Sequence, residues 1–61
     1  MKYTIGDRVS FEDYDGHTFL GEVFECHREP WGYEYTVRFH DWLTAGRRVS
    51  RVVREDVMRP A

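Results

Sequence analysis

The sequence predicts an all-β fold, a small antiparallel barrel of five strands, and two observations carry that prediction. Residues 33–39 alternate strictly between apolar and polar side chains, the period of a strand buried on one face. No stretch of twelve residues shows the period of an amphipathic helix. We therefore take residues 33–39 as the central strand of the barrel.

The elements before this strand follow from turn signals and apolar spacing. Gly6-Asp7 marks a turn within a first strand at residues 5–11, where Ile5, Val9 and Phe11 share the inner face. Residues 12–18 are acidic and contain Asp15-Gly16, a hairpin signal, so they are predicted to form a loop.

Residues 19–26 are predicted to form the second strand, with Val23 inside. Its apolar positions do not alternate cleanly, because Leu20 and Phe24 fall out of phase with their neighbours. Gly21 lies between them, and glycine inside a strand often marks a bulge or a sharp bend. We expect the strand to curl at Gly21.

The remaining elements alternate between turns and strands. Residues 27–32 are predicted to be a turn, since Pro30 and Gly32 exclude regular pairing. Residues 40–47 are expected to form a long loop, and residues 48–53 a fourth strand with arginines on its outer face. A tight turn at residues 54–56, which Asp56 is a candidate to cap, then leads to a short closing strand at residues 57–59.

The whole pattern resembles the SH3-like small barrels, the group that includes Tudor-like and KOW-like domains. The resemblance rests on the Gly6-Asp7-Arg8-Val9 opening, on Gly21-Glu22-Val23 in the second strand, and on the tight turn before the last strand. It spans Ile5 to Pro60 and implies a five-stranded barrel, but such barrels host many unrelated activities. The type II dihydrofolate reductases of this group carry Val-Gln-Ile-Tyr where this chain has Val49-Ser50-Arg51-Val52, so their activity is not expected here.

Size and composition limit the class of protein. The chain has 61 residues, which we take as one domain spanning residues 1–61, and its single cysteine, Cys26, excludes an internal disulfide. A reducing compartment is therefore expected. The first residues lack the apolar run of a signal peptide, and no segment has the length of a transmembrane helix. We expect a cytoplasmic protein that does not contact a membrane.

Charge is unevenly distributed along the chain, whose net charge is −2. Residues 1–46 carry nine acidic and four basic side chains, whereas residues 47–61 carry five arginines and two acidic side chains. The near-neutral total argues against a dedicated nonspecific DNA-binding protein. The asymmetry leaves room for a local basic patch.

Aromatic side chains in predicted loops are the first candidates for binding. Trp31 and Trp42 either form a recognition surface, as an aromatic cage or a platform for bases, or close the open ends of the barrel. Tyr14 lies between Asp13 and Asp15, and an acidic rim around an aromatic ring suits a cationic partner such as a Lys- or Arg-bearing segment. These five residues are the predicted partner-binding site.

The arginines near the fourth strand are the alternative candidates. A nucleic-acid contact is the functional interpretation of Arg47, Arg48, Arg51 and Arg54, because the guanidinium fork favours phosphate. The other interpretation is a solvated face that balances the acidic loops and discourages edge-to-edge pairing. The acidic net charge favours this second interpretation.

Neither a metal site nor a catalytic site is expected. Cys26-His27 and His40-Asp41 flank the central strand, so at about 3.3 Å per residue one ion cannot reach both pairs, and His17 stands apart. The acidic pairs Asp13/Asp15 and Glu55-Asp56 fall in predicted exposed turns, where nothing is expected to shift their pKa values. No nucleophile elbow is present and no cofactor is expected.

The favoured hypothesis is a small non-catalytic module for protein–protein interaction. Small stand-alone barrels that resemble this chain are common among phage-encoded and accessory bacterial factors, which implies a viral or accessory role. The first alternative is a nucleic-acid-binding barrel that uses the four arginines. The second is a structural subunit that assembles as a homo-oligomer and stabilises its small core by association.

Overall fold

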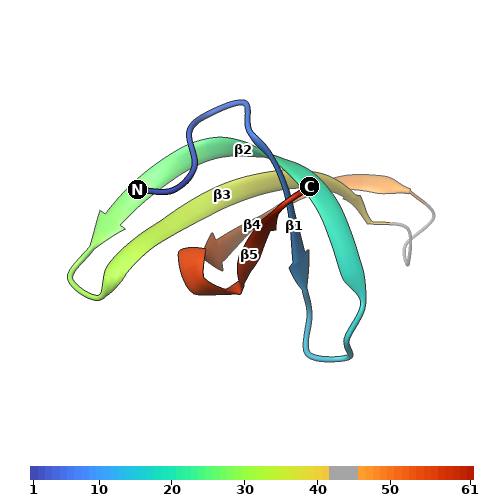
Figure 1. Ribbon diagram of the computed structural model, residues 1–61. Coiled ribbons are helices and arrows are strands. Elements are labelled where there is room, and N and C mark those ends of the chain that lie inside the picture. The colour runs from blue at the N-terminus through green and yellow to red at the C-terminus, as the bar shows by residue number, and fades with distance from the viewer. Residues whose placement is uncertain (42–45) are drawn as a thin grey trace.

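The computed structural model describes residues 1–41 and 46–61. Five strands form one antiparallel sheet in the order β4-β3-β2-β1-β5 (Figure 1). The elements are β1 (Arg8–Glu12), β2 (Thr18–Glu29), β3 (Gly32–Asp41), β4 (Arg47–Arg54), the 3-10 helix η2 (Glu55–Val57) and β5 (Met58–Pro60). The all-β prediction is confirmed.

The sheet bends into an arch but is not closed into a barrel. Figure 1 shows β2 and β3 as two long curved ribbons, with η2 and β5 beneath them. β4 and β5 are the two edges of the sheet, and no pairing joins them in the described residues. β2 takes the middle position of the sheet, between β1 and β3, whereas the sequence predicts residues 33–39, which form β3, as the central strand.

The core lies on the inner face of the arch and receives side chains from every strand. In β3, Tyr35, Val37 and Phe39 are buried while Arg38 between them is exposed, so the predicted alternation is confirmed. The buried set as a whole is Tyr3, Val9, Phe11, Phe19, Val23, Tyr35, Val37, Phe39, Val53 and Met58. Three phenylalanine rings of this set lie with centroids 5.1 to 5.7 Å apart.

The prediction for the start of the first strand is wrong. β1 begins at Arg8, and Ile5 is 69% exposed. Residues 4–7 form a turn in which the Asp7 N–H donates to the Thr4 carbonyl at 3.0 Å. This turn breaks the period-2 pattern, and Tyr3 becomes the buried residue of the N-terminal segment, with its ring edge-on to Tyr35.

The irregularity predicted in the second strand is present, but it lies three residues beyond Gly21. The register of β2 against β3 shifts between Val23 and Glu25, which makes Phe24 the bulged residue. Gly21 instead marks close packing, because a Cβ there would lie 2.5 Å from the Arg38 carbonyl oxygen. Val23 is buried, as predicted.

The turn predicted at residues 27–32 is shorter in the structure. Residues 27–29 continue β2 and pair with residues 32–34 of β3. Pro30 and Trp31 alone make the turn, and Gly32 leaves it with a φ of +136°, a value that side chains with a Cβ rarely adopt. The fourth strand and the tight turn after it match the prediction to within two residues, but η2 has no side-chain cap, so Asp56 does not cap it.

Candidate functional site

The loop between β1 and β2 is held in shape by Asp13. Its Oδ1 accepts hydrogen bonds from the backbone N–H groups of Asp15 and His17, both at 3.0 Å, and its Oδ2 lies 3.4 Å from His17 Nδ1. The Gly16 N–H also donates to the Asp13 carbonyl at 3.1 Å. These bonds place the residue between Asp13 and Asp15 at the tip of a braced turn.

The sequence-based prediction that nothing shifts the pKa values of the carboxyl groups in this turn is wrong for Asp13. Asp13 is half-buried, and burial by itself would raise the pKa of its carboxyl group. The backbone N–H groups of His17 and Asp15 and the His17 ring outweigh that effect and lower the pKa below its ordinary value of 3.8. Asp13 is therefore a charged brace of the loop at neutral pH.

Tyr14 stands fully exposed at the tip of this loop, with a relative exposure of 105%. Beside the loop lies a groove of about 490 Å³, which we call the acidic groove. It runs between the β1–β2 hairpin and the η2–β5 segment, and its charged lining is Glu12, Asp13 and Asp56 against Arg59. Sequence reasoning identified the loop but missed the side of the groove that η2 supplies.

Trp31, one of the two tryptophans in the predicted partner-binding site, lies on a different turn from Tyr14. Trp31 is 60% exposed at the β2–β3 turn, and its Nε1 donates to Glu34 Oε2 at 3.1 Å. Figure 1 shows this turn at the opposite end of the arch from the β1–β2 loop. Trp31 is thus not a buried lid, and Trp42 lies outside the described residues.

The four candidate arginines divide between the two sides of β4. Arg48 and Arg54 have the strand parity of exposed Val52, whereas Arg47 and Arg51 have the parity of buried Val53. All four arginines are exposed, and Arg54 Nε lies 3.7 Å from Asp56 Oδ1. The four therefore do not form one face.

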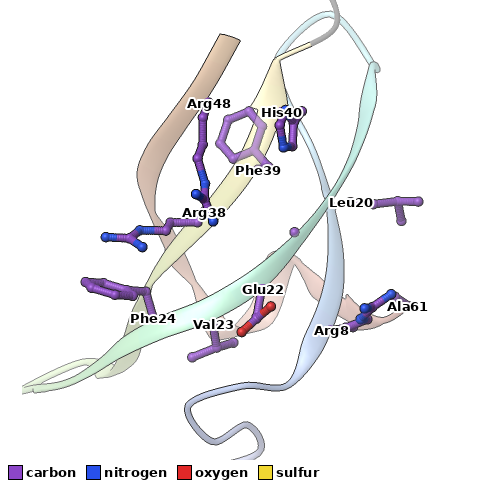
Figure 2. Close-up of a pocket in the computed structure, with 11 residues that line it drawn as sticks. Arg8, Leu20, Glu22, Val23, Phe24, Arg38, Phe39, His40, Arg48 and Ala61 are labelled. Carbon is purple, nitrogen blue, oxygen red and sulfur yellow. The ribbon is translucent and has the colours of Figure 1, made fainter. Parts of the chain in front are cut away.

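A second groove, of about 470 Å³, gathers a different set of arginines (Figure 2). We call it the arginine groove; its charged side chains are Arg8 from β1, Glu22 from β2, and Arg38 and Arg48 from β3 and β4. Its other lining residues are Leu20, Gly21, Val23, Phe24, Phe39, His40 and Ala61. Within the part of the chain that the structure describes, the two grooves share no lining residue.

Phe24 is the feature of the arginine groove that sequence reasoning missed. The Arg38 guanidinium carbon lies 3.6 Å from the centroid of the Phe24 ring, a stacked cation–π contact. Phe24 is 43% exposed because it continues the outward-facing positions of Leu20 and Glu22 along β2. The sequence did contain an indication of this position. Phe24 is out of phase with Phe19 and Val23, which face the core, so its ring must lie on the outer face of the strand.

The remaining perturbed groups belong to a structural network that ties the N-terminal segment to η2. The Tyr35 hydroxyl donates to Glu55 Oε2, which also accepts from the Lys2 N–H at 3.0 Å. Burial, and then the bond to Glu55, raise the pKa of Tyr35 to about 12, while the Tyr35 hydroxyl and the Lys2 N–H lower the pKa of Glu55. The prediction of an unperturbed Glu55 is wrong, but neither groove is lined by Tyr35 or Glu55.

One group of potential metal ligands occurs in the β1–β2 loop. Ligand atoms of Asp13, Asp15 and His17 lie within 4.8 Å of one another, so His17 does not stand apart as predicted. Both carboxylate oxygens of Asp13 already serve the loop's own contacts. The cluster is explained by the brace that it forms.

Comparisons of the chain with protein families, with curated proteins and with solved structures found no match. Within residues 1–41 and 46–61, no helix is long and apolar enough to cross a membrane.

Proposed function

We propose that the protein is a small non-catalytic binding module that recognises a basic segment of a protein partner through the acidic groove and Tyr14. We also propose that its fold is an open variant of the SH3-like small barrel. Five antiparallel strands with a 3-10 helix before the last one support the fold assignment.

The observation that carries the function is a fully exposed aromatic ring on a braced acidic loop beside a groove. An exposed tyrosine contributes nothing to a core, and a rigid aromatic side chain gives contact area at low cost in conformational entropy. The hydrogen bonds of Asp13 fix the loop before any partner arrives, which lowers the cost of ordering it on binding.

Charge selects the kind of partner. Three carboxylates line the acidic groove against one arginine, and Asp15 adds a fourth on the exposed side of the loop. Complementary charge steers association and suppresses partners of the wrong sign. A Lys- or Arg-bearing segment with room for contact to the Tyr14 ring fits this surface.

The test is affinity capture of the tagged protein from its host's lysate, with nuclease treatment in parallel. We expect a stoichiometric protein partner that survives nuclease and whose affinity falls at least about tenfold in Tyr14→Ala. The double variant Glu12→Gln/Asp56→Asn should weaken the same partner and reduce the salt dependence of its binding. Val52→Ala, an exposed apolar residue on β4, is the matched control.

Two results would contradict the proposal. Equal affinity of the Tyr14→Ala and Val52→Ala proteins for the partner would remove the loop from the interface. Full loss of binding in Trp31→Ala, with none in Tyr14→Ala, would move the interface to the β2–β3 turn.

A further inference from the structure

The arginine groove has a surplus of positive charge that the described structure does not neutralise. Among the side chains that the structure describes, in residues 1–40 and 46–61, Arg8, Arg38 and Arg48 make no ion pair, and Glu22 is the one acidic side chain in the lining. Glu22 pairs in register with both Arg8 and Arg38, so it offsets only part of their charge. The groove therefore suits an anionic ligand.

The spacing of the arginines favours a ligand with repeated charges. They come from β1, β3 and β4, and at about 4.8 Å between neighbouring strands this set spans about 14 Å. Figure 2 shows Arg38 and Arg48 on one side of Glu22 and Arg8 on the other. One small anion does not reach all three arginines, whereas a chain of phosphates or carboxylates does.

The stack of Arg38 on Phe24 favours a chain of phosphates, that is a nucleic acid, over a chain of carboxylates such as an acidic peptide. Bases stack on guanidinium planes and on aromatic rings, and single strands leave their bases free to do so. Phe24 and Arg38 already form such a stack at 3.6 Å on the solvent-facing side of the sheet, and a base placed against it extends the stack by one layer. An acidic peptide offers carboxylates but no comparable flat ring along its backbone.

We propose that the arginine groove binds single-stranded nucleic acid, with Arg8, Arg38 and Arg48 contacting phosphates and the Phe24–Arg38 pair stacking a base. The site is separate from the acidic groove, so a test of nucleic-acid binding does not depend on whether the proposed protein partner binds there. It also differs from the arginine set predicted from the sequence, of which only Arg48 lies in the groove.

The test is fluorescence polarisation of a labelled oligodeoxythymidylate titrated with the protein over a salt series. Three phosphate contacts predict a slope of about −2 for log K against log salt, at about −0.7 per contact for single strands. Arg38→Gln should make the slope shallower by about 0.7 and weaken binding. Arg51→Gln, which removes the same charge outside the groove, is the matched control and should leave the slope unchanged.

Arg38→Lys separates charge from stacking. It keeps the phosphate contact, so the slope should stay at its original value, while loss of the planar group should lower the affinity about fivefold or more. Thermal unfolding of each variant checks that the fold is retained. If Arg38 had only a structural role, Arg38→Lys would not lower the affinity for the oligonucleotide while leaving both the salt slope and the unfolding temperature unchanged.

Several outcomes would overturn the inference. The first is the absence of any polarisation change at low salt. The second is an equal loss of affinity in Arg38→Gln and Arg51→Gln, which would mean diffuse attraction with no site in the groove. Tighter binding of poly-glutamate than of the oligonucleotide would assign the groove to an acidic polypeptide, and equal binding of a duplex would remove the stacked base.

Discussion

Replacing Gly21 by alanine tests the packing on which the arginine groove depends. An added Cβ would lie 2.5 Å from the Arg38 carbonyl oxygen, 2.6 Å from Val37 Cγ1 and 3.1 Å from Phe39 Cβ. The first of these neighbours is backbone of a paired strand and cannot rotate away. Overpacking of this kind costs about 1–3 kcal/mol, which in a domain of this size lowers the Tm by about 5–20 °C.

The assay is thermal unfolding followed by circular dichroism, with Leu20→Ala as the matched control. Leu20 is the neighbour of Gly21 and is 67% exposed, so its truncation should change the unfolding free energy by less than about 0.5 kcal/mol. A Gly21→Ala protein as stable as the parent would refute the close approach of β2 to β3. Because Gly21 also lines the arginine groove, a destabilised but folded variant should bind oligodeoxythymidylate less tightly.

Three further predictions concern pH, the loop and association. The pKa of Glu55 is lower in the folded protein, so its contribution to stability is present above pH 4.5 and is lost as the pH falls through the lowered pKa. The pKa of Tyr35 is raised, so its contribution is present below pH 10 and is lost as the pH rises from 10 to about 12. Tyr35→Phe removes the bond between the two groups and should flatten the unfolding free energy at both the acidic and the alkaline end of the pH profile. Asp13→Ala should speed hydrogen exchange at the amides of Asp15 and His17, whereas Asp15→Ala should not; equal exchange in both would remove the brace. Finally, the arginines on the β4 edge should keep the protein monomeric, with a Tm independent of protein concentration; a Tm that rises with concentration would support the homo-oligomer alternative instead.

Local patterns were enough to predict most strands. The alternation over residues 33–39 identified β3, and Asp15-Gly16 identified the β1–β2 turn, because side-chain period and turn chemistry are properties of a few consecutive residues. The prediction that Ile5 faces the core was wrong because it rested on this local period alone. A turn at residues 4–7 interrupts the strand, and the pattern of apolar residues by itself does not show which of Tyr3 and Ile5 reaches the core.

The candidate loop site was partly predictable and the grooves were not. Tyr14 between two aspartates was visible in the sequence as an exposed acidic aromatic, but the Asp56 side of the acidic groove comes from a segment more than forty residues away. The arginine groove likewise joins Arg8, Arg38 and Arg48 from three strands. Such sets depend on strand order and register, which local sequence does not encode.

The sequence by itself determined that the chain is all-β, where most of its strands lie, and that its first loop is acidic and aromatic. Only the tertiary structure decided which charged side chains come together to line each of the two grooves. Strand pairing placed Phe24 of β2 against Arg38 of β3 on the outer face of the sheet, and the bend of the sheet brought η2 to the β1–β2 loop. The physical reason is that burial period is local to a strand, whereas a binding surface is made by neighbours that only pairing and curvature bring together.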